Sequence, residues 1–246
     1  MTNTSALGRL FGVGLGPGDP DLITVKSLKA LQSAPVIAYF AKKGRKGNAR
    51  TIADTLIPSG AIELPLVYPV TVEIPFSDPA YIDALSEFYE RSAESIASHL
   101  EAGRNVALLC EGDPLFYGSF MHAYERLKDR FPVTICPGVT GMSGCWTAVG
   151  APMTWGDDVL CVLPGTLSRD ELVKRIQAAD AVVVMKLGSN FIKVREVLVE
   201  TGLAGRAFYV ERGTMAEEVV MPLLKKSDDK APYFSMILVP GQGRRP

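Results

Sequence analysis

Residues 12–20 form the stretch that most constrains how this chain can fold. They read Gly-Val-Gly-Leu-Gly-Pro-Gly-Asp-Pro and lie between a short apolar run and a helical pattern. Glycine lets the backbone approach a ligand closely because it has no Cβ, and Asp19-Pro20 is typical of a helix N-cap and first turn. The stretch fails as a G-x-G-x-x-G dinucleotide fingerprint, because Pro17 replaces the third glycine and no acidic residue ends the next strand-like run, residues 36–40. We therefore expect a ligand loop of another kind.

The composition predicts a soluble globular protein. Its 246 residues, 47% hydrophobic and 22% charged, allow one large domain or two ordinary ones. The net charge of -1 gives no electrostatic case for binding nucleic acid or an anionic membrane. No apolar run approaches the roughly 18 residues of a membrane span, and residues 1–9 lack the apolar centre of a signal peptide. We therefore expect a cytoplasmic protein.

The cysteines and histidines argue against a metal site. The four cysteines, Cys110, Cys136, Cys145 and Cys161, lie in or beside apolar runs and form no C-x-x-C. We expect buried free thiols, which suits a reducing cytoplasm, rather than disulfides or metal ligands. The two histidines, at positions 99 and 122, both fall in helical patterns. This placement disfavours a zinc site and a histidine-based catalytic site.

Apolar runs typical of strands alternate with helical patterns along the chain. The strand-like runs are residues 36–41, 105–110, 133–136, 159–163, 180–185, 207–210 and 233–239. Such alternation predicts an α/β fold with mostly parallel or mixed sheets. We expect two α/β domains, residues 1–136 and residues 137–246, joined at the Pro137-Gly138 turn.

Capping signals predict where several helices begin. A proline-rich segment, residues 58–79, predicts extended pieces and turns, and Asp78-Pro79 at its end opens a long helical pattern. Ser168-x-x-Glu171 and Thr214-x-x-Glu217 are capping boxes, in which the first side chain caps the helix and the fourth residue bonds back. We expect a helix after each box.

Three loops rich in glycine and proline follow strand-like runs: residues 12–20, 111–119 and 137–144. Ligands of open α/β sheets bind at this edge. None of the loops contains a phosphate-binding G-x-x-x-x-G-K-[ST] or a G-x-S-x-G elbow, which disfavours ATP and a serine triad. Backbone groups, small residues and the Asp113 carboxylate suit a ligand with an amino-acid end, an adenine and no phosphate. S-adenosylmethionine has this chemistry, although each loop taken alone is also explained as a tight turn.

A basic loop follows the second strand-like run. Its five cationic residues are Lys42, Lys43, Arg45, Lys46 and Arg50. One interpretation is a solvated charge run. The other is a flexible loop that meets an acidic substrate, since it lies at a strand end where ligand loops occur.

The chain resembles the tetrapyrrole (precorrin) methyltransferases of the cobalamin and sirohaem pathways. The matching motifs span the chain in family order: G-L-G-P-G-D-P-x-L-I-T-x-K at 14–26, E-G-D-P at 111–114, P-G-V-T at 137–140 and E-R-G-T at 211–214. The basic loop, residues 111–119 and Tyr-Phe-Ser-Met at 233–236 most resemble the branch that methylates precorrin-2 at C20.

The resemblance implies S-adenosylmethionine bound in a cleft between two α/β domains, S-adenosylhomocysteine as product, and a homodimer. It implies cofactor contacts at Pro17, Glu111, Gly112, Asp113, Phe116, Thr140, Gly141, Met185, Lys186, Leu187, Gly213, Ser235 and Met236. It also implies contacts with the acidic substrate at Lys42, Arg45, Lys46, Arg50 and Tyr117. Glu111 and Tyr117 are the groups to consider as a proton-removing base, and the resemblance assigns neither. It implies no metal.

Two departures from related enzymes narrow the expected reaction. Uroporphyrinogen-III methyltransferases usually carry D-x-x-x-Y-D at the second strand and G-G-D-P-x-x-F-G-R in the third loop, whereas Phe40 and Ser119 stand at the last position of each motif here. The resemblance therefore implies methylation of precorrin-2 at C20 to give precorrin-3A in cobalamin biosynthesis. Alternatives are a cobalt-factor II C20-methyltransferase, a nucleotide-binding oxidoreductase, and a non-catalytic tetrapyrrole-binding protein.

Overall fold

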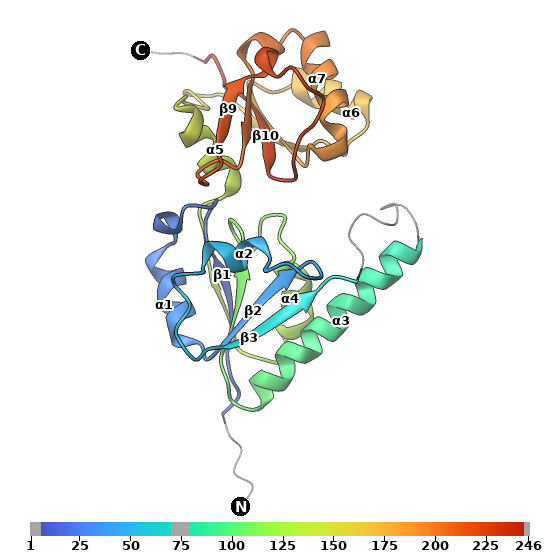
Figure 1. Ribbon diagram of the computed structural model, residues 1–246. Helices are drawn as coiled ribbons and strands as arrows, with labels where there is room; N and C mark the ends of the chain where they lie inside the picture. Colours follow the sequence, from blue (N-terminus) through green and yellow to red (C-terminus); the bar gives the residue numbers. More distant parts are fainter. Residues whose placement is uncertain (1–5, 70–78, 244–246) are drawn as a thin grey trace, which may run out of the picture. The chain divides into compact units, whose positions relative to one another are not determined.

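The computed structural model describes residues 6–69 and 79–243. The chain forms two compact units, Met1–Thr140 and Gly141–Pro246, each with its own sheet and helices (Figure 1). Residues 137–140, which the sequence analysis assigned to the C-terminal domain, belong to the first unit. The predicted helix start at Asp78 lies outside the described residues. Two α/β units confirm the predicted fold class.

The described part of the first unit contains a five-stranded parallel sheet in the order β3-β2-β4-β1-β5. Its strands are β1 (Leu10–Gly14), β2 (Val36–Ala41), β3 (Ile62–Val67), β4 (Val106–Cys110) and β5 (Val133–Cys136). The three inner strands are buried at nearly every position because helices cover both faces.

Alternate strand residues face different helices. On one face, Ile37 and Leu109 pack with α1 (Val25–Ser33) and α2 (Asn48–Ile52). On the other face, Ala38 and Leu108 pack with α3 (Pro79–Glu101) and α4 (Phe120–Leu127). This alternation follows the two-residue period of a strand.

A topological switch point lies between the neighbouring strands β4 and β1. The chain leaves β1 through α1 toward β2, whereas it leaves β4 through α4 toward β5, on the opposite face of the sheet. Such divergent connections open a crevice outside the carboxyl ends of the two strands, which is where α/β sheets bind ligands. The fold thus places the first and second predicted glycine loops at this position.

The first helix begins later than the sequence analysis expected. Asp19 does cap a turn, since its carboxylate accepts a hydrogen bond from the Asp21 N–H at 2.9 Å. That turn is only a short 3₁₀ helix, η1 (Pro20–Leu22). Helix α1 starts at Val25, where the Thr24 hydroxyl accepts from the Ser27 N–H.

The described part of the second unit has a mixed sheet in the order β6-β7-β10-β8-β9. Its strands are β6 (Leu160–Pro164), β7 (Ala181–Met185), β8 (Phe208–Glu211), β9 (Val219–Pro222) and β10 (Ser235–Val239). Only β6 and β7 are parallel, and the other pairs are antiparallel. The carboxyl ends of β7 and β8 and the start of β10 therefore meet at one edge.

Helices cover both faces of this second sheet. Helix α5 (Gly141–Val149) packs on one face, and α6 (Arg169–Gln177) and α7 (Phe191–Glu200) pack on the other. The predicted N-cap at Ser168 is confirmed, since its hydroxyl accepts from the Glu171 N–H and α6 follows, while the Glu171 carboxylate accepts from Arg175. Short 3₁₀ turns complete the unit: η2 (Gly188–Asn190), η3 (Ala204–Arg206) and η4 (Leu223–Lys225).

The prediction of a helix after Thr214 is wrong. The backbone of Thr214 has φ +70°, which is not the extended conformation of an N-cap. Its N–H donates to the carboxylate of Glu218 at 2.6 Å, so the residues form a turn. The chain then enters β9, which pairs with β8.

Candidate ligand site at the strand ends

The loops after β1 and β4 are joined backbone to backbone at the switch point. The Gly112 N–H donates to the Gly16 carbonyl at 2.7 Å, and the Gly16 N–H donates to the Gly112 carbonyl at 3.4 Å. The Leu15 N–H donates to the carbonyl of Cys110. These amides of the first glycine loop are thus used within the protein and cannot cradle a phosphate.

The loop after β5 packs against the same point. A Cβ built on Gly138 would lie 2.1 Å from the Gly112 carbonyl oxygen, and one built on Gly14 would lie 2.6 Å from the Gly138 nitrogen. Both positions therefore require glycine. The structure brings all three predicted loops into direct contact. Pro17, predicted to contact the cofactor, is buried in the first of them.

Asp113 holds two of these loops together. Its carboxylate accepts hydrogen bonds from the Leu115 N–H at 2.9 Å and from the Gly138 N–H at 3.1 Å. The resemblance implies a cofactor contact at Asp113. The structure shows that this carboxylate also has a structural role, which the E-G-D-P motif does not reveal.

Glu111 is exposed by surface area, but the surrounding protein atoms still desolvate its carboxyl. This burial raises the pKa of Glu111 above its usual value. Hydrogen bonds from the Ala49 backbone and the Asn48 side chain act in the opposite direction. The first turn of α2 thus contacts the end of β4.

Strained backbone marks the predicted ligand loops of both units. Among the described residues, the positive φ angles of non-glycine residues occur at Tyr117 (55°), Lys186 (57°), Arg212 (47°) and Thr214 (70°). Each lies in a loop after β4, β7 or β8. Such strain costs about 1–3 kcal/mol per residue and gathers at functional sites.

The loop after β4 contains a pair of aromatic residues in contact with each other. Phe116 and Tyr117 form an edge-on contact with ring centroids 4.9 Å apart. Tyr117 is 46% exposed although its backbone is strained. Its side chain is therefore accessible for the substrate contact that the resemblance implies.

The basic loop is only partly available to a ligand. Lys42, Lys43 and Arg45 are exposed just after β2. Lys46 is exposed too, but its Nζ lies 3.1 Å from Asp54 Oδ1. These side chains surround the carboxyl end of β2, next to the loops described above.

Arg50 requires a correction. Its guanidinium is buried and donates to both Glu63 carboxylate oxygens at 2.8 Å and to Asp54 at 2.6 Å. Hydrogen bonding from Arg50 holds the pKa of Glu63 at about 2, and Tyr39 donates to the same carboxylate. The buried Arg50 therefore anchors α2 to β3, and we remove it from the substrate-binding set.

Tyr68 lies at the same edge as the predicted ligand loops but was not among the residues predicted from the sequence. It directly follows β3, and its hydroxyl lies 2.7 Å from the Ser119 Oγ. Its ring stacks on Phe40 with centroids 5.7 Å apart. The signal in the sequence was an aromatic residue at the end of an extended segment, at the same edge as the ligand loops.

The second unit gathers its predicted residues at one edge. Ser235 pairs with Glu211 across β10 and β8, and Met185 ends the neighbouring β7. A Cβ on Gly213 would lie 2.9 Å from Cys145 Sγ, so this turn packs tightly on α5. A Cβ on Gly141 would lie 3.2 Å from the Met236 methyl group.

Several of these side chains have structural positions. Leu187 is fully buried in the core, and the buried Ser235 hydroxyl donates to the Pro232 carbonyl at 2.6 Å. A ligand would therefore meet their backbone groups. Met185 and Met236 are half-buried, and Lys186 is exposed. Thr140, the last residue of the first unit, is half-buried.

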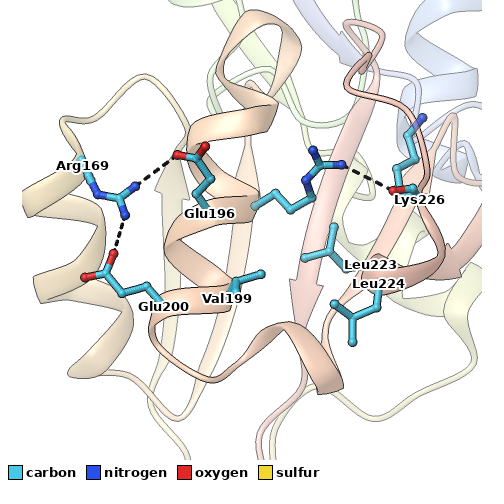
Figure 2. A pocket seen from close by; sticks show the side chains of 8 residues that line it. Arg169, Glu196, Val199, Glu200, Leu223, Leu224 and Lys226 are labelled. Atoms are coloured by element: carbon cyan, nitrogen blue, oxygen red, sulfur yellow. Dashed lines mark hydrogen bonds and ion pairs between the residues drawn. The ribbon is translucent and has the colours of Figure 1, made fainter.

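A separate hollow lies in the second unit between α6, α7 and η4 (Figure 2). Figure 2 shows Arg169 between the carboxylates of Glu196 and Glu200. Arg195 donates to the Lys226 carbonyl and pairs with Asp229. The cations here are matched by carboxylates within the chain, and none of the predicted site residues lines the hollow.

No cluster of three or more metal-ligating side chains occurs in residues 6–69 and 79–243. Within the same ranges, no helix combines the length and the hydropathy of a membrane span. Cys110, Cys136 and Cys145 are buried free thiols, as predicted, whereas Cys161 is only half-buried.

Comparison with known proteins identifies the fold and the family. The model of the tetrapyrrole (corrin/porphyrin) methylases matches residues 9–226. The precorrin-2 C(20)-methyltransferase of Sinorhizobium sp is 55% identical over 240 residues, 98% of each chain. The cobalt-precorrin-2 C(20)-methyltransferase of Salmonella typhimurium is 28% identical over 94% of this chain and 96% of its own. The uroporphyrin-III C-methyl transferase of Thermus thermophilus, solved with S-adenyl homocysteine, has a TM-score of 0.63 at 23% identity and covers 94% of this chain and 97% of its own. This chain belongs to the tetrapyrrole (corrin/porphyrin) methylase family.

Proposed function

We propose that this chain transfers a methyl group from S-adenosylmethionine to C20 of precorrin-2, giving precorrin-3A in cobalamin biosynthesis. The observation that carries the proposal is the 55% identity to the Sinorhizobium enzyme over 98% of both chains. The joined glycine loops support it, because their amides are bonded within the protein. A dinucleotide-binding oxidoreductase would need those amides, and a helix N-terminus beside them, for the pyrophosphate.

The residues at the strand ends fit the cofactor by their chemistry. In the first unit, Glu111 offers a carboxyl group for an ammonium, and Phe116 offers an aromatic ring. In the second unit, Met185 and Met236 offer apolar side chains for an adenine, beside the strained backbone of Lys186. S-adenosylmethionine supplies an electrophilic methyl group when bound. We propose these residues, with Pro17, Gly112, Thr140, Gly141, Leu187, Gly213 and Ser235, as its contacts.

The exposed cations after β2 suit a substrate with many carboxylates. Within the described residues Lys42, Lys43 and Arg45 form no ion pair, and Lys46 pairs with one exposed aspartate. Charge-assisted hydrogen bonds to carboxylates are about twice as strong as neutral ones. We propose that these side chains, together with Tyr117, hold the carboxylate side chains of the tetrapyrrole.

The main task of the protein is to align the two reactants. The C20 meso carbon belongs to an electron-rich, enamine-like ring, so it is a nucleophile without activation. Holding a nucleophile at bonding distance from its electrophile can contribute up to ~7–11 kcal/mol. We assign no residue as the base that removes the C20 proton.

A cobalt-bearing substrate is the second candidate, because the Salmonella cobalt-precorrin-2 enzyme also matches nearly the whole chain. The higher identity to the Sinorhizobium enzyme favours the metal-free substrate. We also propose a cytoplasmic location, from the composition and the free cysteines, and a homodimer, on the resemblance alone. Light scattering of the purified protein tests the dimer.

The deciding experiment follows methyl transfer with a ¹³C-methyl-labelled donor. Purified protein is incubated under anaerobic conditions with precorrin-2 or with its cobalt complex. We expect one labelled methyl group at C20 of the metal-free ring, detected by NMR, and a faster rate than with the cobalt complex. Lack of transfer to either ring refutes the proposal, and faster transfer to the cobalt complex favours the second candidate.

A further inference from the structure

Residues from the ends of two adjacent strands and from the loop after a third converge in the first unit. The order β3-β2-β4 places these ends side by side. Phe40, near the end of β2, stacks on Tyr68, which follows β3. The Tyr68 hydroxyl then lies 2.7 Å from the Oγ of Ser119, which precedes α4. All three residues are half-buried, so part of each remains accessible at this edge.

Further rings support this arrangement from behind. The Tyr89 hydroxyl donates to the same Ser119 Oγ at 3.3 Å, and its ring stacks on His122 with centroids 4.0 Å apart. Phe88 packs against Tyr68 at 4.7 Å. Aromatic contacts of this kind contribute about 0.5–1.5 kcal/mol each, so they favour the observed positions of Phe40 and Tyr68 beside Ser119.

The three residues present no charge at neutral pH. Burial raises the pKa of Tyr68, so its phenol stays protonated. Partial burial also lowers the pKa of His122, with help from the nearby Arg126, which favours the uncharged imidazole stacked on Tyr89. We call Phe40, Tyr68 and Ser119 the uncharged wall.

Charged groups border the uncharged wall on both sides. Lys42 and Lys43 follow Phe40 closely along the chain and are exposed. On the other side, Glu111 directly follows the neighbouring β4, and its charge acts on Tyr68. A carboxylate of a ligand is attracted to the lysines and is repelled from the uncharged wall by Glu111.

We propose that the uncharged wall is a specificity determinant that receives the bare meso edge of the tetrapyrrole while the basic loop holds its carboxylates. This inference rests on the proposed function. In the substrate, the carboxylates are attached to the pyrrole rings, whereas the C20 bridge between two rings carries only hydrogen. The boundary between the lysines and the uncharged wall therefore matches the boundary between the carboxylate side chains and the reacting carbon.

The two positions that depart from the uroporphyrinogen-III methyltransferase motifs both belong to the uncharged wall. By the resemblance stated above, those motifs carry an aspartate and an arginine at these positions, whereas this chain has Phe40 and Ser119. They are distant in sequence, but both contact Tyr68. A cation at position 119 would attract a carboxylate to the place that the reacting carbon must occupy. The expected result is a substrate that binds in the wrong orientation.

The test is the variant Ser119→Arg, compared with Ser119→Ala and with the control Ser98→Arg. Ser98 is exposed on α3 and lies outside the site, so its variant adds the same charge elsewhere on the unit. Thermal unfolding checks the fold of each variant. Precorrin-2 binding is measured by fluorescence without cofactor, and S-adenosylhomocysteine binding by calorimetry. The rate and position of methylation are measured with the ¹³C-labelled donor.

We expect Ser119→Arg to bind precorrin-2 at least as tightly as the unmodified protein but to methylate C20 at least tenfold more slowly. Its affinity for S-adenosylhomocysteine stays within about twofold. Ser119→Ala loses less activity, because no charge enters the uncharged wall. If Ser119→Arg does not fold, Phe40→Lys compared with Phe40→Leu applies the same test at the second position.

Unchanged C20 methylation by a folded Ser119→Arg overturns this inference. An equal loss in Ser119→Ala also overturns it, since the hydroxyl and not the absence of charge would then matter. If the unmodified protein itself fails to methylate precorrin-2, the proposed function is refuted instead.

Discussion

The carboxylate of Asp113 accepts a hydrogen bond from the backbone N–H of Gly138 across the end of β1. It links the loop after β4 to the loop after β5, while a second bond to the Leu115 N–H folds its own loop. One side chain thus fixes the positions of two predicted ligand loops. The E-G-D-P motif has an aspartate that the architecture itself requires.

The first prediction removes this link. Asp113→Ala leaves two backbone amides without their acceptor, and hydrogen bonds to a charged group contribute about 1.5–3 kcal/mol. We expect the free energy of unfolding, measured in urea, to fall by at least the value of one such bond, and the affinity for S-adenosylhomocysteine to fall with it. Asp129→Ala, at an exposed position of the same unit, is the control. Equal stability of the two variants would show that the link is dispensable.

The second prediction concerns the contact between Gly138 and Gly112. In Gly138→Ala, the new methyl group would lie 2.1 Å from a backbone oxygen that cannot rotate away. Overpacking of this kind costs about 1–3 kcal/mol, and a backbone neighbour puts the expected loss at the upper end. Gly205→Ala is the matched control, because a Cβ there has open space around it. Thermal unfolding of both variants measures the difference.

Local patterns in the sequence predicted the parts of the structure that depend on local chemistry. Ser168 caps α6 as the capping box indicates, and the apolar run 181–185 forms a buried strand. Thr214 begins the same capping-box pattern, but the residues after it lead into β9, which pairs with β8 instead of forming a helix. No local pattern reveals this pairing. Local patterns also do not reveal which side chains are buried or which partners they bind. Arg50 resembles its basic neighbours in sequence, yet Glu63 and Asp54 enclose it.

The third prediction separates Arg50 from the other cations of its loop. Arg50→Gln breaks the ion pairs with Glu63 and Asp54 and should lower stability by about 1–3 kcal/mol. This is below the ~3–5 kcal/mol of a fully buried pair, because solvent reaches both carboxylates. The double variant Lys42→Gln/Arg45→Gln should unfold at an unchanged temperature, while its KM for precorrin-2 rises several-fold at constant kcat, as expected for lost substrate binding. A raised KM without lost stability in Arg50→Gln would restore Arg50 to the substrate site.

The ion pair between Arg50 and Glu63 also makes the stability of the folded protein depend on pH. The lowered pKa of Glu63, about 2 in the folded protein, means that its stabilisation is present above the pKa of the unfolded chain and is lost as the pH falls through the folded value. The stability difference between the unmodified protein and Arg50→Gln should therefore shrink between pH 5 and pH 2. Urea unfolding at a series of pH values measures it. A constant difference over this range would mean that packing of the Arg50 stem, not its charge, carries the effect.

The fourth prediction concerns Glu111, whose pKa is raised by burial. A carboxyl with a raised pKa binds its proton more tightly in the folded chain than in the unfolded chain. Its contribution to stability is thus present below the unfolded pKa and is lost as the pH rises through the folded pKa. Glu111→Gln, which stays neutral, should therefore be more stable than the unmodified protein at pH 8 and similar to it at pH 4.

The affinity for the cofactor should fall in Glu111→Gln at pH 8, where the stability of this variant rises. If Glu111 binds the ammonium of the cofactor, Glu111→Gln loses one charge-assisted hydrogen bond, and the affinity for S-adenosylhomocysteine at pH 8 falls about tenfold or more. Glu101→Gln, on an exposed surface of the same unit, should change neither property. A stabilised Glu111→Gln with undiminished cofactor affinity and lost methyl transfer would instead give this carboxyl a role in proton removal. Either result would give Glu111 a functional role. Such a role would explain why this carboxyl stands where burial disfavours its charge, as is common at functional sites.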